Sequence, residues 1–269
     1  MTKFLFNSII LFLLSGCASL TSRQDPRNIN GLSQFEKSLV KTDEFVITTY
    51  QKINSNSSPY VFYIEGDGAI MRGRSIASDP TPRQGTLLKL MAMDQRPNII
   101  YLARPCQFTN TKLNPKCTNN TYWTDKRLSE EVIGSLNQVI NKTNSSQKFS
   151  LIGYSGGGAA ALLIAARNKR VKDIITIVAN IDTEAFVKHH KSRLMHGSLN
   201  PRDFIQQTKH IPQMHLSGEY DRIVPTDIAA KYIQKANSKC VKMQIIKGAT
   251  HSKGWKGFWL DYNKAPICD

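Results

Sequence analysis

The 269-residue sequence contains no run of about 18 apolar residues, the length that a helix needs to cross a bilayer. A multipass membrane protein is therefore excluded. Sequence repeats of about 20–50 residues are also missing, which argues against solenoids and propellers. The apolar fraction of 41 % is nevertheless sufficient for a packed core, so wholesale disorder is not expected.

Acidic residues are few, because 20 Asp and Glu face 36 Lys and Arg, which gives a formal net charge of +16. The basic residues are scattered, with short clusters such as residues 167–170, and no nucleic-acid-binding signature stands out. We therefore expect no nucleic-acid partner. The excess charge indicates either a solvated basic face or attraction to anionic lipid and other polyanions at a membrane surface.

The first residues have the pattern of an export signal. Lys3 supplies a positive charge, and Phe4–Leu14 is mostly apolar but too short to span a bilayer. The next residues, Leu-Ser-Gly-Cys ending at Cys17, resemble the lipobox of bacterial lipoproteins. The resemblance implies that residues 1–16 are removed as a signal peptide and that Cys17 is diacylated. Ala18, in place of Asp, resembles lipoproteins that are sorted to the outer membrane.

A diacylated Cys17 would anchor the chain stably, because stable membrane attachment takes two signals and two acyl chains supply them. Residues 17–40, which include many Ser, Thr, Gln, Asn and Arg, are expected to form a tether that leads into a first helix or strand. The resemblance therefore implies a protein attached to the bacterial cell envelope, at the outer membrane and facing the periplasm.

The four other cysteines contain no Cys-x-x-Cys pair and no matching His pattern, which argues against a zinc site. Four cysteines allow three pairings. We favour Cys106–Cys117, which closes a short polar loop, and Cys240–Cys268, which attaches the C-terminal tail to a late strand. An oxidising periplasm suits both disulfides, and free buried thiols are the alternative.

Apolar runs and helical patterns alternate from about residue 44 to the end of the sequence. Continuous apolar strands separated by helices predict an α/β fold, with a mostly parallel, doubly wound sheet and helices on both faces. We assign this domain to residues 41–269, and residues 182–212, which lack a clear core pattern, are expected to form a small lid. The expected strands cover residues 44–53, 60–64, 98–103, 149–152, 173–179, 214–217 and 241–246, and the expected helices 128–140, 159–166, 228–236 and 255–262.

A Gly-x-Ser-x-Gly motif, residues 153–157, lies between an apolar strand and an Ala-rich helix. This context is that of a nucleophile elbow, a sharp strand-to-helix turn that lifts a serine clear of the sheet. A Cβ at Gly153 or Gly157 would clash in so tight a turn. The turn also places the Ser155 hydroxyl near a helix N-terminus, where developing negative charge is favoured.

These motifs resemble the α/β-hydrolase superfamily, in particular its esterase- and lipase-like serine hydrolases, over most of the chain. In that family the catalytic residues come in the order Ser, acid, His. The resemblance assigns Ser155 as the nucleophile, Asp221 as the acid and His251 as the base. Asp182 is the rival acid, because some hydrolases of this class place the acid after the preceding strand.

The resemblance also implies an oxyanion hole formed by the backbone N–H groups of Gly156 and Asp67. The family often has His-Gly at the second position, whereas residues 65–68 here read Glu-Gly-Asp-Gly. A carboxylate beside a developing oxyanion opposes it unless it points away or is paired. We expect Arg72 or Arg74 to pair with Asp67.

Together these features predict a monomeric serine hydrolase that cleaves a small-molecule or lipid ester through an acyl-serine intermediate, with thioesters and amides as further candidates. No metal and no organic cofactor are expected. An acyltransferase with the same triad is the first alternative, because it differs only in what attacks the acyl-enzyme. A non-catalytic envelope lipoprotein that keeps the fold for binding is the second.

Overall fold

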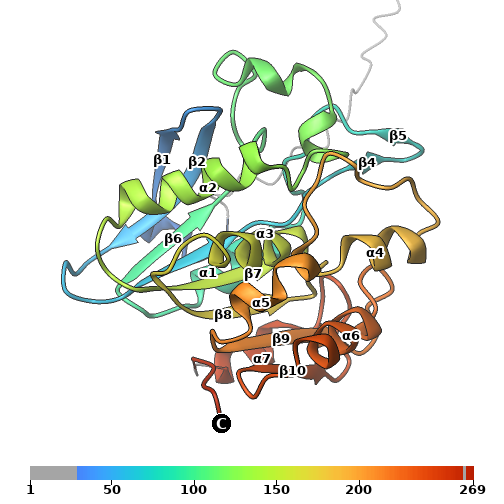
Figure 1. Cartoon of the computed structure of the whole chain (residues 1–269). Coiled ribbons are helices and arrows are strands. Elements are labelled where there is room, and N and C mark those ends of the chain that lie inside the picture. The colour runs from blue at the N-terminus through green and yellow to red at the C-terminus, as the bar shows by residue number, and fades with distance from the viewer. Residues whose placement is uncertain (1–28, 263–264) are drawn as a thin grey trace, which may run out of the picture.

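The computed structural model describes residues 29–262 and 265–269. The predicted signal peptide, the lipobox and Cys17 lie outside these residues. An eight-stranded sheet runs through the molecule in the order β1-β2-β6-β3-β7-β8-β9-β10 (Figure 1). Its strands are β1 (Glu36–Lys41), β2 (Val46–Ile53), β3 (Tyr60–Ile64), β6 (Asn98–Leu102), β7 (Phe149–Tyr154), β8 (Val171–Ile177), β9 (Gln213–Gly218) and β10 (Val241–Ile246).

Six of these strands, from β6 to β10 along the sheet, are parallel to one another, and β2 runs antiparallel to both of its neighbours, β1 and β6. The central strands β3, β6 and β7 are buried along their whole length. Strands covered on both faces have near-continuous apolar sequences, and for this reason their positions could be predicted from the sequence. The predicted fold, a mostly parallel α/β sheet, is confirmed.

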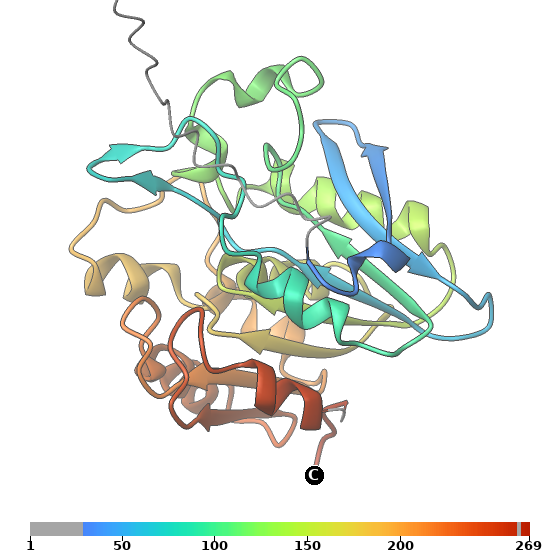
Figure 2. The same cartoon turned by 180° about the vertical axis from the view of Figure 1, so that it is seen from behind.

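Helices cover both faces of the sheet (Figures 1 and 2). One core layer lies under α2, α3, α5 and α6, and the other under α1 and α7. The helices are α1 (Thr86–Ala92), α2 (Glu130–Thr143), α3 (Gly156–Ala165), α4 (Thr183–His189), α5 (Ile205–Thr208), α6 (Thr226–Ala236) and α7 (Lys256–Asp261), with 3₁₀ turns at Leu32–Gln34, Pro115–Thr118, Thr121–Trp123 and Pro201–Phe204.

Strand β1 lies within the segment expected to be a tether. Its residues pair with β2 from Glu36 opposite Gln51 to Lys41 opposite Val46. The sheet therefore begins at Glu36, ahead of the expected domain boundary at residue 41. The strand is an edge strand with no fully buried residue, so its sequence carries little of the apolar pattern by which strands are recognised.

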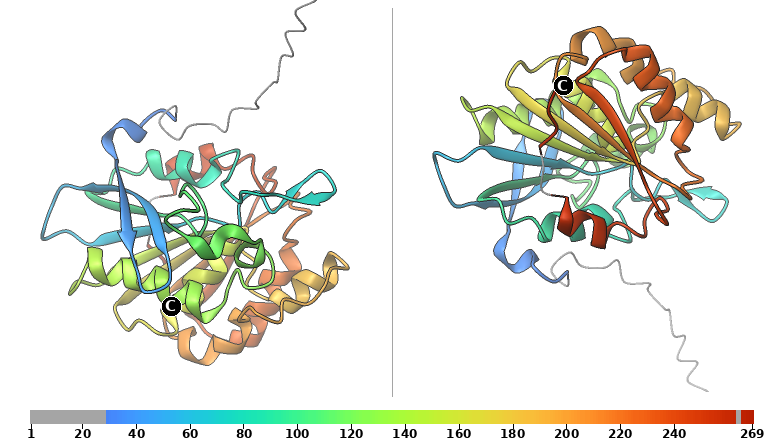
Figure 3. Two further views of the ribbon diagram at one scale, coloured as in Figure 1. Left: turned by 90° about the horizontal axis from the view of Figure 1, so that it is seen from above. Right: turned by 90° about the horizontal axis from the view of Figure 1, so that it is seen from below.

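A short hairpin of β4 (Met71–Arg72) and β5 (Ser75–Ile76) projects beyond the carboxyl ends of the parallel strands (Figures 1 and 3). It follows the loop after β3. At the same end of the sheet lie α4 and the loops after β7, β9 and β10. Ligands of open α/β sheets bind outside this end of the strands, so the site is sought there.

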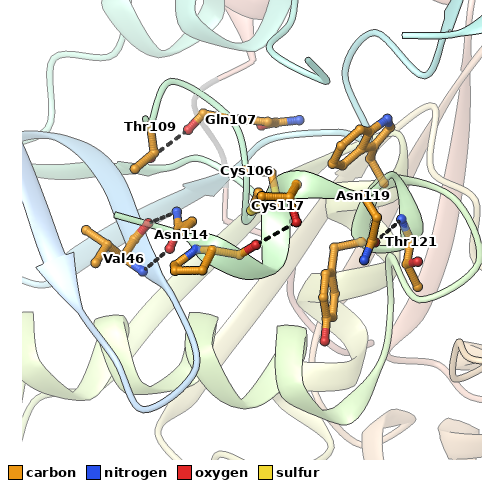
Figure 4. The surroundings of a disulfide bond; sticks show 12 residues. Val46, Cys106, Gln107, Thr109, Asn114, Cys117, Asn119 and Thr121 are labelled. Atoms are coloured by element: carbon orange, nitrogen blue, oxygen red, sulfur yellow. Dashed lines mark hydrogen bonds between the residues drawn. A yellow bond between two sulfur atoms is a disulfide. The ribbon is translucent and has the colours of Figure 1, made fainter. Parts of the chain in front are cut away.

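Both expected disulfides are present. Cys106–Cys117 closes a loop with a sequence separation of 11, and Cys240–Cys268 attaches the C-terminal tail to the residue before β10. Inside the first loop, the Asn114 side chain accepts a hydrogen bond from the Val46 N–H at 2.7 Å and donates one to the Val46 carbonyl at 2.9 Å (Figure 4). The disulfide and this amide together fix the polar loop against β2.

Within the described ranges, no helix combines the length and the apolar character that crossing a membrane requires.

Candidate active site

Ser155 occupies a strained turn between β7 and α3. Its backbone angles are φ 50° and ψ −123°, a region that residues with a side chain rarely adopt. The Ser155 N–H donates to the Ile177 carbonyl of the neighbouring strand at 2.8 Å, which helps to hold the turn. Such strain costs about 1–3 kcal/mol and persists where the surroundings enforce it, often at functional sites.

Two glycines of the motif allow this turn to form. A Cβ on Gly153 would lie 2.4 Å from the Gly157 carbonyl oxygen, and a Cβ on Gly157 would lie 2.1 Å from the Ile64 carbonyl oxygen. Both distances are far below van der Waals contact. The clash expected from the sequence is therefore confirmed at both positions, and β7, α3 and β3 meet closely only because these residues are glycines.

The three predicted triad residues meet at the carboxyl end of the sheet. His251 Nε2 lies 3.2 Å from Ser155 Oγ, within reach of a hydrogen bond between the hydroxyl and the ring nitrogen. His251 Nδ1–H donates to Asp221 Oδ2 at 2.8 Å. Three loops that follow three different strands thus supply one continuous chain of hydrogen bonds.

Asp221 is held rigidly from its other side. Its Oδ1 accepts hydrogen bonds from the backbone N–H groups of Ile223 at 2.8 Å and Val224 at 3.0 Å, and its side chain is fully buried. Oδ2 is thereby left for His251. The residues directly after Asp221 therefore form the turn that holds its carboxylate.

Asp182, the rival acid, has a different role. Its Oδ1 accepts from the Ala185 N–H at 3.0 Å and so caps the N-terminus of α4. Its Oδ2 pairs with Arg202 at 3.0 Å. The imidazole of His251 bonds to Asp221, and no hydrogen bond joins it to Asp182 among the described residues.

Tyr154 supports the loop that carries His251. Its hydroxyl donates to the His251 carbonyl at 2.8 Å, and the two rings lie 5.4 Å apart between centroids. Burial raises the pKa of Tyr154 well above its ordinary value, so the hydroxyl keeps its proton and remains a donor. The residue before the nucleophile thus also positions the base, which the sequence did not reveal.

The two groups expected to form the oxyanion hole lie next to each other. Gly66 brings the loop after β3 against the nucleophile, since a Cβ there would lie 3.1 Å from the Ser155 Cβ. Among the residues that the structure describes, the backbone N–H groups of Gly156 and Asp67 have no hydrogen-bond acceptor. Both donors are therefore free to bind a developing oxyanion.

The Asp67 carboxylate lies directly over Gly156, where an added Cβ would be 2.1 Å from Asp67 Oδ1. Two buried arginines compensate its charge. Arg104 lies 3.4 Å from Oδ1, and Arg127 Nε lies 3.2 Å from Oδ2. The Asp67 carboxylate is therefore paired with cations, as expected, but the expectation that Arg72 or Arg74 would be its partner was wrong.

Arg72 and Arg74, which we expected to pair with Asp67, lie exposed in the β4–β5 hairpin. The pairing of Arg127 with Asp67 could not be predicted from the sequence. Arg127 lies in the loop before α2, and only the fold brings it to Asp67. Arg104 directly follows the run of β6, and its position at a strand end was the available clue. With two cations around one carboxylate, this side of the oxyanion hole has an excess of positive charge.

A second buried carboxylate, Glu65, was not recognised from the sequence as part of the site. Its Oε1 accepts from the Gly66 N–H at 2.8 Å, and its Oε2 accepts from the Tyr101 hydroxyl at 2.7 Å. Burial raises the pKa of Glu65 to about 7, although these two hydrogen bonds and the charge of Arg104 oppose the rise. Glu65 therefore fixes the loop that carries Asp67.

Glu65→Gln is expected to remove a pH dependence of stability. The folded protein keeps the Glu65 proton up to about pH 7, whereas the ordinary pKa is 4.5, so the free energy of unfolding falls as the pH rises between these values. Wild type should lose up to about 3 kcal/mol more than the variant over this range. Urea unfolding of both proteins near pH 4.5 and pH 8 measures this, and parallel behaviour would contradict the raised pKa.

A cleft of about 530 Å³ opens above the serine. Its walls come from the loop after β3, the hairpin, the start of α1 and α4, and from Ile223 after β9. Within the segment expected to form a lid, Phe186 of α4 and His190, the residue after α4, line the cleft. Most of the lining surface is apolar, which suits a substrate with an apolar part beside the scissile bond. The polar side chains outside the triad include Glu65, Asp67, Arg83, Gln84, Thr86, His190 and Ser252.

Metal ligands do not gather in this cleft. Across residues 29–262 and 265–269, no group of three or more His, Cys, Asp and Glu side chains has an arrangement that could hold a metal ion.

Neither a protein-family model nor a curated protein sequence matches the chain. Solved structures do match it. The Pyrococcus furiosus esterase Pf2001 superimposes with a TM-score of 0.62 at 12 % identity, covering 89 % of this chain and 93 % of that one. Est1E from Butyrivibrio proteoclasticus gives 0.59 at 13 % identity, covering 84 % and 94 %.

The esterase domain of a Rhodothermus marinus protein is also similar, with a TM-score of 0.58 at 16 % identity over 85 % of this chain and 94 % of that one. The chain has the α/β-hydrolase fold. Because the likenesses cover 84–89 % of this chain, the fold extends over most of it and is not limited to one motif. At such low identities the likeness extends to the fold, and the chemistry has to be argued from the residues of the cleft.

Proposed function

We propose that the protein is a serine hydrolase of carboxylic esters. The observation that carries the proposal is the hydrogen-bond chain from Ser155 through His251 to the buried Asp221, at the bottom of an open, mostly apolar cleft. A binding module needs neither this series of hydrogen bonds nor the strained turn that presents the serine. The names of the similar structures, three of them esterases, also support ester chemistry.

In the first half of the proposed reaction, Ser155 Oγ attacks the ester carbonyl carbon while His251 Nε2 takes the hydroxyl proton. The carbonyl oxygen becomes an oxyanion that accepts hydrogen bonds from the Gly156 and Asp67 N–H groups. Asp221 stabilises the imidazolium and keeps Nδ1 protonated. The tetrahedral intermediate then expels the alcohol, which takes the proton from His251, and an acyl-Ser155 ester remains.

In the second half, His251 takes a proton from a water molecule, whose oxygen attacks the acyl carbon. The second tetrahedral intermediate uses the same two N–H donors. Its collapse releases the carboxylic acid, and His251 returns the proton to Ser155 Oγ. The proton transfers run through Ser155, His251 and Asp221, which already lie within hydrogen-bond reach of one another.

We propose further that the chain is a lipoprotein of the bacterial envelope, attached through Cys17. The lipobox sequence supports this location, and so do the two disulfides, which are typical of oxidising compartments. Metabolic labelling with a palmitate analogue tests it. Label is expected on the wild-type chain and not on Cys17→Ser, and an unlabelled wild type would exclude the anchor.

A fluorophosphonate probe tests the proposed function directly, because it reacts with a serine whose hydroxyl is activated. We expect one covalent adduct on the folded chain, located at Ser155 by peptide mass spectrometry, and hydrolysis of p-nitrophenyl esters by the same preparation. An adduct without release of free acid, but with acyl transfer to added alcohols, would favour the acyltransferase. Folded protein that forms no adduct would favour the binding lipoprotein.

A further inference from the structure

Exposed apolar side chains gather around the mouth of the cleft. Eleven large hydrophobic residues are exposed in the part of the chain that the structure describes, and five of them lie within three short segments. We call these three segments, residues 71–76, 188–194 and 220–223, the rim. Its exposed apolar residues are Met71, Ile76, Leu194, Tyr220 and Ile223, each between 46 % and 62 % exposed.

The rim is one continuous part of the surface and not three unrelated loops. Met71, His190 and Ile223, one from each segment, line the same cleft. The ring of His189 lies 3.3 Å from the Arg222 carbonyl, and the ring of His190 lies 2.7 Å from the Ile223 carbonyl. Figures 1 and 2 show the hairpin and α4 projecting from the same side of the molecule.

The rim is also strongly basic. Its only acidic residue is Asp221, which is buried and bonded to His251. None of its cations forms a salt bridge with a residue that the structure describes. The six exposed cations are Arg72, Arg74, Lys188, Lys191, Arg193 and Arg222.

Unpaired cations interleaved with exposed aliphatic tips fit an anionic lipid surface. The cations meet phosphate groups at headgroup depth, and the apolar tips enter the boundary of the acyl region. A nucleic acid would satisfy the cations but would leave the aliphatic tips without a use. Exposed apolar side chains gathered in this way are costly in water and mark interaction sites.

We propose that the rim docks the open cleft onto an anionic lipid bilayer, so that the substrate is an amphiphilic ester taken from that surface. The docking rests on the rim alone, and the substrate class rests in addition on the proposed function. The cleft opens between the rim segments, so a docked molecule presents Ser155 to the lipid phase with little water between them.

The opposite end of the sheet supplies a matched control. Lys148, Lys169 and Lys172 are exposed beside the starts of β7 and β8 and line a separate hollow. No large exposed apolar residue lines that hollow. Neutralising these lysines changes the net charge as much as neutralising three rim arginines, but at a surface that the proposal leaves free.

Co-sedimentation with vesicles tests the docking. The full chain carries Cys17→Ser throughout, so that no acyl group contributes, and the vesicles are either phosphatidylcholine alone or phosphatidylcholine with phosphatidylglycerol. The combination Arg72→Gln, Arg74→Gln and Arg193→Gln is expected to weaken binding to the anionic vesicles on the order of a hundredfold. The combination Lys148→Gln, Lys169→Gln and Lys172→Gln should weaken it less than tenfold.

A second pair of variants separates apolar insertion from charge. Ile76→Ser with Leu194→Ser should also weaken binding to anionic vesicles, whereas Ile53→Ser with Leu260→Ser, two exposed apolar residues away from the rim, should not. Equal effects of rim and control variants would overturn the proposal. So would wild-type binding to heparin without binding to vesicles, because the partner would then be a soluble polyanion.

Hydrolysis of soluble p-nitrophenyl butyrate, measured without vesicles, keeps the two proposals apart. If wild type cleaves this ester but the rim variants bind vesicles normally, the docking is wrong and the hydrolase stands. If wild type binds vesicles through the rim but cleaves no ester, the proposed function and the substrate class are wrong and the docking stands. Both proposals together predict that the rim variants lose turnover of a vesicle-borne ester far more than turnover of the soluble one.

Discussion

Ser155→Ala is expected to lower the kcat for a p-nitrophenyl ester by about 10⁴–10⁶-fold. The variant removes the only atom that forms the acyl-enzyme, whereas the oxyanion donors and the cleft remain. Residual catalysis by these donors limits how far kcat can fall. The measurement is the initial rate at saturating ester, with circular dichroism to show that the variant folds.

Ser252→Ala is the matched control for this variant. Ser252 lines the same cleft and follows the base directly, but no hydrogen bond joins it to the triad in the described structure. Its loss should change kcat by less than tenfold. A Ser155→Ala protein that keeps more than about a hundredth of the wild-type rate, with contamination excluded by active-site titration, would show that another group is the nucleophile.

Asp221→Asn should be almost as severe, with a fall in kcat of about 10⁴-fold. The amide oxygen would take the place of Oδ1, because the N–H groups of Ile223 and Val224 require an acceptor there. The amide NH₂ would then face His251 Nδ1 and donate to it. The imidazole proton is then forced onto Nε2, and a protonated Nε2 can no longer accept the proton of Ser155.

Asp182→Asn tests whether the effect belongs to the triad. That substitution keeps an oxygen to accept from the Ala185 N–H and weakens the ion pair with Arg202. We expect a modest loss of stability and a kcat within about tenfold of wild type, because Asp182 is not bonded to His251. The reverse result, with Asp182→Asn inactive and Asp221→Asn active, would contradict our scheme, because it would identify Asp182 as the acid.

The sequence predicted the interior of the fold better than its surface. The bounds of β3 are as expected, and those of β7 and β9 differ by at most two residues at either end, because buried strands show as apolar runs. Helix α1 was missed, since seven residues are too few for a convincing helical period. The hairpin was missed for a related reason, because two-residue strands carry no alternation at all.

The site was predictable where one local motif implied the next, and not where distant residues meet. The serine turn and the order of acid and base led to Ser155, Asp221 and His251, which the structure brings together. The partners of Asp67 could not be derived, because Arg104 and Arg127 reach it from loops after β6 and before α2, and no spacing links them. From the sequence, Arg72 and Arg74 were equally suitable partners for Asp67, but in the structure both are exposed to solvent.

The triad is distributed along the chain in an order that matters while the protein is being made. The nucleophile belongs to the middle of the sequence, whereas the base that activates it lies 96 residues later, after the last strand of the sheet. A nascent chain therefore carries its serine for some time before it carries anything able to deprotonate it. On the proposed mechanism, an unfinished polypeptide, or one truncated by a premature stop codon ahead of His251, should be inert toward esters, because it has the serine without the base.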